Sequence, residues 1–340
     1  MKCKRIIPCI VLLILAASAL VAQTKTPRYL EITFLSTNDL HTKLWPFTIA
    51  ANPAKNTPEM KDVGGAARRA TVIRKVRSEM RTPVLLTDAG DIKGWTAFSS
   101  AYHGKADVAV MNALGYDVMA LGNHEFEWHP SDTSRNLKES EFPWICANIV
   151  YAKTGELFTQ PYIIREVEGV QIAFFALINT LPSSQPNYYK GATELGLKVL
   201  NATETAAKLV PELRQKADIV VLISHLGYRA DVQLAKDVPG IDLILGGHSH
   251  SVILHPTLVP VAQPTAFYLG AVPVEQAGYY GIYLGQTKVV FHKDRDNGHY
   301  TLMNCKGELI PIDSSIPDDP EITALIQDFQ KRIPHPPPAK

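Results

Sequence analysis

The sequence has 340 residues, of which 46% are hydrophobic and 20% are charged, and its formal net charge is +1. This composition is typical of a globular protein and excludes a disordered or collagen-like chain. A nearly balanced charge also argues against the basic face of a protein that binds nucleic-acid polymers. The length fits one large domain or two small ones.

The N-terminus has the pattern of a secretory signal peptide. Three basic side chains within the first five residues precede an apolar run over residues 6–15, and small residues follow as far as Ala22. The run is shorter than the ~20 apolar residues of a membrane span, although an uncleaved anchor is the alternative. We expect residues 1–22 to be removed during secretion across the inner membrane, leaving a periplasmic chain without stable membrane insertion.

Two cysteines, Cys146 and Cys305, lie outside the expected signal peptide and its apolar core. They could pair in an oxidising compartment. Their spacing does not decide whether they do.

Five short apolar runs end abruptly in polar residues, and each predicts a strand buried on both faces. Between them lie four segments with helical periodicity. The alternation predicts an α/β architecture. The apolar runs cover residues 31–35, 84–86, 117–121, 219–223 and 241–245, and the helical segments cover 66–80, 105–114, 202–216 and 230–236.

The later part of the chain has a different pattern. Apolar runs with few helices between them predict a mixed, partly antiparallel second sheet, from residues 170–177, 266–269, 281–291 and 299–305. Polar, proline-containing segments predict surface loops at 52–62 and 181–191. A helix over 320–332 precedes an extended proline-rich tail at 334–340. We find no boundary inside residues 28–333, which we expect to form one catalytic domain.

Each of the five strand ends in the first set carries side chains that bind metals. Loops after parallel strands converge at one edge of a sheet, so these side chains are expected to meet. Imidazole, carboxylate and amide ligands without thiolates suit Zn, Mn or Fe. A lone histidine is more often structural, but this interpretation does not explain a set spread over five blocks. The candidate ligands are Asp39, His41, Asp91, Asn123, His225, His248 and His250, with His124 beside them.

The order of these blocks resembles the calcineurin-like metallophosphoesterases. The segments STNDLH, GGAARRATVI, GKADVAVMNALGYDVMALGNHEF and GIDLILGGHSH are similar to the 5′-nucleotidase branch of that superfamily. The resemblance implies a four-layer α/β/β/α sandwich of two mixed sheets flanked by helices. The strand and helix patterns alone show only that the chain is α/β.

The resemblance also implies two divalent cations bridged by Asp91. Asp91 would be shared between a first site with Asp39, His41 and His250, and a second site with Asn123, His225 and His248. Two such ions neutralise phosphate charge and hold a bridging hydroxide that attacks phosphorus. The implied reaction is hydrolysis of a small phosphate monoester, expected to be a 5′-nucleotide.

His124 is the expected acid that assists the leaving group. In the resembling family an aspartate three residues further on orients this histidine. Here the position holds Glu127, which is one methylene longer.

Several neighbouring residues have less specific interpretations. We interpret Glu125 as a brace for a nearby loop, and Arg68 and Arg69 as a solvated or ion-paired helix face. Trp95 and Phe98 either line the cleft or pack in the core. The six remaining histidines are interpreted as structural, although two of them, His103 and His129, lie near site loops.

Relatives of the 5′-nucleotidase type carry a further domain that supplies a base clamp and phosphate-binding arginines. We expect either a separately encoded nucleotide-binding partner or a chain that works alone with loose substrate choice. The alternatives for the reaction are a cyclic-nucleotide phosphodiesterase or a sulfur-ester hydrolase, and, less favoured, a non-catalytic metal-dependent binding subunit.

Overall fold

The computed structural model describes residues 26–51, 58–127, 129–179, 190–261, 270–295 and 298–333. The expected signal peptide and proline-rich tail lie outside the described residues. So do the apolar run at 266–269 and most of the loop expected at 181–191.

The first of two six-stranded sheets combines parallel and antiparallel strands. Its strand order is β16-β15-β1-β4-β5-β6. The last four strands are parallel, and β15 and β16 are antiparallel additions beside β1. The strands are β1 (Tyr29–Thr37), β4 (Val84–Asp88), β5 (Val118–Ala120), β6 (Trp144–Ile145), β15 (Tyr283–Lys293) and β16 (Tyr300–Pro311).

The second sheet has four parallel strands between two antiparallel edges, in the order β13-β14-β12-β11-β9-β8. Two short strand pairs, β2–β3 and β7–β10, complete the strands of the described chain. The bounds are β8 (Tyr162–Val167), β9 (Val170–Ile178), β11 (Ile219–His225), β12 (Leu243–Gly246), β13 (Thr257–Pro260), β14 (Ala271–Gln276), β2 (Phe47–Ile49), β3 (Met60–Val63), β7 (Ile149–Tyr151) and β10 (Leu197–Val199).

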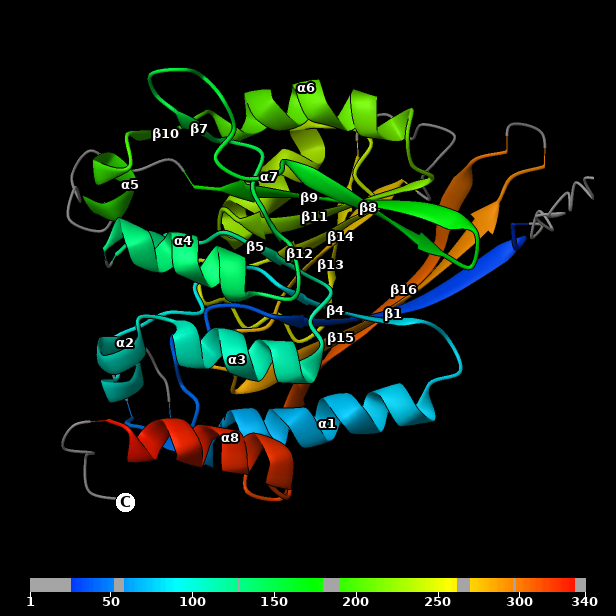
Figure 1. Cartoon of the computed structure of the whole chain (residues 1–340). Helices are drawn as coiled ribbons and strands as arrows, with labels where there is room; N and C mark the ends of the chain where they lie inside the picture. Colours follow the sequence, from blue (N-terminus) through cyan, green and yellow to red (C-terminus); the bar gives the residue numbers. More distant parts are fainter. Residues whose placement is uncertain are drawn as a thin grey trace, which may run out of the picture.

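Helices cover the outer face of each sheet, and Figure 1 shows the resulting layers. On the first sheet lie α1 (Ala66–Glu79), α3 (Lys105–Leu114) and α8 (Pro320–Lys331). On the second lie α6 (Ala202–Arg214) and α7 (Tyr228–Asp237). This arrangement confirms the four-layer α/β/β/α sandwich. The remaining helices of the described chain are α2 (Ala97–Tyr102), α4 (Pro130–Glu139), α5 (Lys190–Glu194) and the 3₁₀ turn η2 (His124–Phe126).

The core explains why the central strands are continuously apolar. Ile32 and Phe34 of β1 face the gap between the sheets, where they join Phe174 and Val221 of the second sheet. Leu35, the next residue on β1, points the other way and packs under the helices. Because successive side chains alternate faces, a strand covered on both sides needs apolar residues at nearly every position.

Two expectations about the sheets were wrong. The segments 281–291 and 299–305 do not join the second sheet, because β15 pairs along β1 from Tyr29 to Ser36 and β16 follows it. The edge of β1 offers unpaired backbone groups, and hydrophobic periodicity does not say which open edge a hairpin will cover. Residues 60–62, expected in a loop, belong to β3 instead.

The two cysteines are not bonded to one another. Cys146 is buried in the core under the helices of the first sheet, whereas Cys305 packs against the core between the sheets. Within the described chain, no helix combines the length and apolar character needed to cross a membrane.

Candidate metal centre

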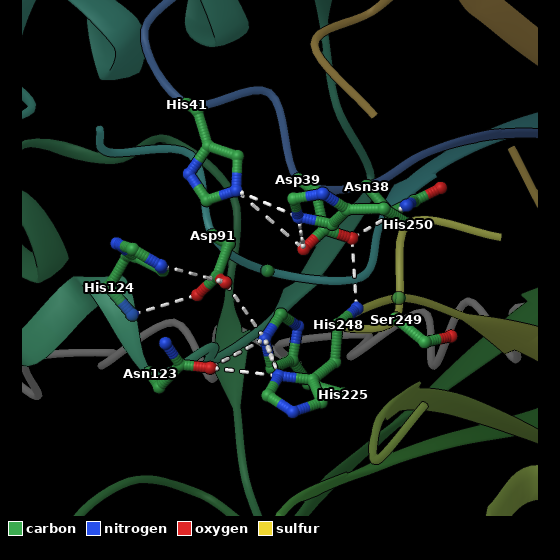
Figure 2. Close-up of polar contacts among 12 residues, drawn as sticks. Asn38, Asp39, His41, Asp91, Asn123, His124, His225, His248, Ser249 and His250 are labelled. Atoms are coloured by element: carbon green, nitrogen blue, oxygen red, sulfur yellow. Dashed lines mark hydrogen bonds and ion pairs between the residues drawn. The ribbon is translucent and has the colours of Figure 1, made fainter. Parts of the chain in front are cut away.

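The seven expected ligands meet where the carboxyl ends of strands from both sheets converge (Figure 2). Three groups of ligand atoms form there, each with all atoms within 4.8 Å of one another. The groups are Asp39 with His41 and His250, then Asp91 with His225 and His248, and between them Asp91 with His41 and His124. Asp91 therefore belongs to two of the groups, and the middle group joins it through His41 to the third, as a bridging ligand requires.

The first group has the donor set of a cation site. Oδ1 of Asp39 lies 3.2 Å from Nε2 of His250 and 3.9 Å from Nε2 of His41. Nδ1 of His41 donates a hydrogen bond of 2.8 Å to the carbonyl of Lys93, so its Nε2 presents a lone pair to the site. That Nε2 lies 3.1 Å from Nε2 of His250. Oδ1 of Asp39 is buried and accepts no hydrogen bond from the described residues, which fits a carboxylate oxygen placed to bind a metal.

The second group is equally compact. Nε2 of His225 lies 3.1 Å from Oδ2 of Asp91 and 3.2 Å from Oδ1 of Asn123. The same Asn123 oxygen lies 2.9 Å from Nδ1 of His248. Nδ1 of His225 donates to the carbonyl of Ala89 at 2.6 Å, which again leaves Nε2 for the site. One carboxylate, one amide oxygen and two imidazoles fit a second divalent cation.

The charges of the second group favour a bound cation. Burial alone would lower the pKa of His225, but the adjacent Asp91 carboxylate raises it to about 10. Burial also opposes ionisation of Asp91, yet His225 and His124 hold the pKa of its carboxyl well below the usual range. Burial and the neighbouring His225 lower the pKa of His248 to about 4. An ionised carboxylate in this buried position requires a positive charge, and a metal displaces the imidazole proton that would otherwise supply it.

The backbone is strained at most of the ligands. Five of the seven have φ in the left-handed region: Asp39 at 50°, His41 at 47°, Asp91 at 61°, His248 at 73° and His250 at 56°. Such angles cost non-glycine residues of order 1–3 kcal/mol each and cluster at functional sites.

Two glycines allow the loops to approach closely. Gly90 has φ of 93°, and a side chain at this position would meet the backbone N–H of Gly122. At Gly122 an added Cβ would overlap Oδ1 of Asp91. Both positions therefore need glycine for Asp91 to reach the centre of the site.

His124 shares the middle group with His41 and Asp91, beside the two outer groups. Its Nε2 lies 3.7 Å from Oδ2 of Asp91, and its Nδ1 lies 2.7 Å from Oε1 of Glu127. Burial lowers the pKa of His124, but these two carboxylates outweigh that effect and raise it. The longer Glu127 side chain thus reaches the imidazole.

Several supporting residues surround the ligands. The brace expected at Glu125 is confirmed, since its carboxylate accepts backbone hydrogen bonds from Asp91, Ile92 and Gly122. Sequence reasoning missed Asn38, whose amide donates to Asp39 at 2.6 Å, and Asn179, whose amide lies 3.2 Å from Nε2 of His248. Asn38 directly precedes a ligand, which is the signal that could have identified it.

Lys93 was also missed. This fully buried lysine accepts the His41 hydrogen bond through its carbonyl and donates from Nζ to the Glu125 carbonyl at 2.7 Å. It therefore links the loop after β1 to the turn that carries His124.

Three pairs of neighbouring residues were interpreted from the sequence: two arginines, two aromatic residues and two histidines. Arg68 is ion-paired with Asp62 at 3.0 Å, as expected. Arg69, expected on a solvated or ion-paired face, is 2% exposed and buried against Gly281. Phe98 packs in the core, but Trp95 is 67% exposed beside His124. The two histidines near the site loops have structural contacts: His103 pairs with Asp132, and His129 caps α4.

The fold and the two ligand clusters define a metal-dependent hydrolase. Residues 32–252 match the calcineurin-like phosphoesterases, and the chain belongs to that family.

Three relatives place the chain within the family. The 5′-nucleotidase of Bos taurus is 33% identical, over 94% of this chain and 56% of its own length. A 2′,3′-cyclic-nucleotide 2′-phosphodiesterase/3′-nucleotidase of Salmonella typhimurium is 29% identical, over 87% of this chain and 48% of its own. The crystal structure of a 5′-nucleotidase precursor from Thermus thermophilus superposes with a TM-score of 0.73 at 28% identity, covering 88% of this chain and 58% of that one. The chain spans about half the length of these relatives.

Proposed function

We propose that this chain hydrolyses small phosphate monoesters of the 5′-nucleotide type, with two divalent cations and His124. The observation that carries the proposal is that Asp91 belongs to two histidine-containing ligand groups, with His124 between Asp91 and Glu127. Two cations held there would neutralise the phosphoryl oxygens and lower the pKa of a bound water.

The protein residues supply the rest of the chemistry. Asp39, His41 and His250 would hold one cation, and Asn123, His225 and His248 the other, with Asp91 shared. His124 would stabilise charge on the phosphoryl group and give a proton to the departing alkoxide. Glu127, at 2.7 Å from Nδ1, keeps the imidazole in the orientation that presents Nε2 to the substrate.

The substrate assignment rests on the relatives named as 5′-nucleotidases. A phosphodiesterase acting on cyclic nucleotides is the second candidate, because the Salmonella relative carries that name at a similar identity. The chain spans about half the length of these relatives. Its selectivity for a nucleotide is therefore part of the proposal, whether the chain acts alone or with a separately encoded partner. Action in the periplasm is also inferred, from residues 1–22 alone.

A direct test uses the purified chain with Mn²⁺ or Zn²⁺ against a panel of phosphate mono- and diesters. We expect hydrolysis of monoesters and about two bound metal ions per chain. Asp91→Asn should lose metal and activity together, whereas His124→Ala should lose activity and keep the metal. Retention of hydrolysis by both variants would contradict the site assignment, and diester cleavage alone would favour the second candidate.

A further inference from the structure

Trp95 is an exposed aromatic side chain beside the buried metal centre. Of the large apolar side chains that the structure describes, it is the most exposed, at 67%. Its ring lies 4.9 Å from the ring of His124 at an interplanar angle of 74°, an edge-to-face contact. His124 is itself 7% exposed, so Trp95 lies at the boundary between the acid and solvent.

The loop holds Trp95 in this exposed position, because the residues on both sides of Trp95 are anchored. Lys93 is held through its carbonyl by His41 and through Nζ by the carbonyl of Glu125. Gly94 packs so closely that a Cβ there would lie 2.6 Å from the carbonyl oxygen of His41. Thr96 caps α2 by accepting a hydrogen bond of 3.1 Å from the backbone N–H of Ser99. The ring is therefore held next to His124 by a loop whose backbone is fixed on either side.

The position of Trp95 identifies the part of a substrate that it would meet. A proton donor must lie next to the oxygen of the leaving group, so the leaving group lies on the His124 side of the cluster. Tyr280 meets the ring of His41 edge-to-face at 5.5 Å, and Tyr279 stacks on His250 at 5.0 Å. Figure 2 shows His250 at the opposite end of the cluster from His124. Trp95 is thus an exposed aromatic side chain in contact with the acid, on the side of the cluster where the departing group would lie.

We propose that Trp95 is a stacking platform for the nucleoside part of the leaving group, and so a specificity-determining residue in this chain. The proposal rests on the proposed phosphomonoesterase function and deepens it. Bases stack on aromatic side chains without depending on a particular hydrogen-bond pattern. Trp95 therefore favours substrates that carry a base over those that do not, without choosing sharply among bases.

The kinetic test compares AMP with ribose 5-phosphate, which share a primary 5′ leaving oxygen and differ in the base. Trp95→Ala should raise KM for AMP by about ten-fold and leave the values for ribose 5-phosphate unchanged. Trp95→Phe keeps a ring and should stay close to wild type. Tyr29→Ala is the matched control, since Tyr29 is a 54% exposed aromatic residue at the opposite end of β1. Equal losses on both substrates, or no loss on either, would overturn the proposal.

A binding measurement keeps this test separate from the proposed reaction. Adenosine with inorganic phosphate should quench the tryptophan fluorescence of the Zn²⁺-loaded chain, and ribose with phosphate should not. Trp95→Phe should abolish the quenching while calorimetry still detects adenosine, and Trp95→Ala should weaken the binding itself. If the chain hydrolyses no monoester, the proposed function fails, yet base-dependent quenching would still support the platform. Quenching that persists in Trp95→Phe would refute it.

Discussion

Oε2 of Glu125 accepts a hydrogen bond of 2.9 Å from the backbone N–H of Asp91. The same carboxylate accepts from Ile92 at 3.0 Å and from Gly122 at 2.7 Å. Glu125 is fully buried and follows His124 in the chain, so one side chain connects the turn that carries the acid to the loop that carries the shared metal ligand. Three backbone donors aimed at one carboxylate fix the position of Asp91 before any metal binds.

Glu125→Gln should therefore damage the site although it conserves size. The amide NH₂ group would face backbone N–H groups that also donate, which leaves buried donors unsatisfied at about 1–3 kcal/mol. We expect a lower melting temperature and less bound metal, measured by calorimetry and mass spectrometry. Glu156→Gln is the control, because Glu156 is an exposed carboxylate away from the site. Unchanged stability and metal content in Glu125→Gln would show that the brace is unnecessary.

Gly122→Ala tests the close approach of the two loops. The φ of Gly122 lies outside the left-handed region, so the added methyl group acts through its overlap with Asp91, at both Oδ1 and the backbone nitrogen. Moving that oxygen should remove the ligand shared by both groups, and we expect loss of most bound metal and activity. Spectroscopic titration with Co²⁺ would measure the change in metal affinity.

Gly155→Ala provides the comparison for Gly122. Gly155 has φ of 76° and no neighbour within 4 Å of an added Cβ, so its substitution strains the backbone without touching the site. It should lower stability modestly and leave metal binding intact. Wild-type metal affinity in Gly122→Ala would mean that Asp91 can shift without cost.

The ligands could be predicted from sequence because each follows a recognisable apolar run. Asp39, Asp91 and His248 come just beyond buried strands, and the carboxyl ends of neighbouring strands share an edge. The four-layer fold itself came from resemblance, since periodicity does not specify sheet order. The assignment of β15 and β16 to the wrong sheet shows this limit.

The supporting residues were harder to predict because their roles depend on contacts distant in sequence. Lys93 resembles a surface lysine until the structure shows it buried between His41 and the Glu125 carbonyl. Trp95 and Phe98 have similar apolar character and nearby positions, yet one is exposed and the other buried. Only the orientation of the loop before α2 distinguishes them.

Replacement of Glu127 should affect turnover more than metal binding. Its Oε1 contacts Nδ1 of His124 at 2.7 Å, and it lies outside the three ligand groups. Glu127→Gln keeps an acceptor but loses the charge, so we expect kcat to fall about 10-fold with little change in KM. Glu127→Asp should also be impaired, because the shorter side chain leaves the imidazole without its contact. Metal content is the internal control, and a large loss of metal in either variant would contradict a positioning role.

The last prediction concerns Glu275, a carboxyl buried between the two sheets. It accepts a hydrogen bond of 2.5 Å from Ser36 of β1 and another from Thr287 of β15. Burial raises its pKa from 4.5 to about 7, against the opposing effect of the Ser36 hydrogen bond. Because the folded-state pKa is raised, the neutral carboxyl contributes stability that is fully present below pH 4.5 and is lost as the pH rises through 7. The difference between the folded-state and unfolded-state pKa corresponds to roughly 3 kcal/mol of folding stability.

Glu275→Gln should remove this pH dependence. Both hydroxyl partners can rotate to suit an amide, so the variant should match wild type near pH ~4.5 and exceed its unfolding free energy at about pH 8.5. Urea denaturation of the metal-free proteins at several pH values measures the unfolding free energy of each. Subtracting the value of wild type from that of the variant cancels the titration of the other buried carboxyls. Glu308→Gln, on the exposed part of β16, is the control and should give no pH-dependent difference. The unfolding free energies of Glu275→Gln and wild type could instead differ by a constant amount across this pH range. That result would show that Glu275 does not titrate within it.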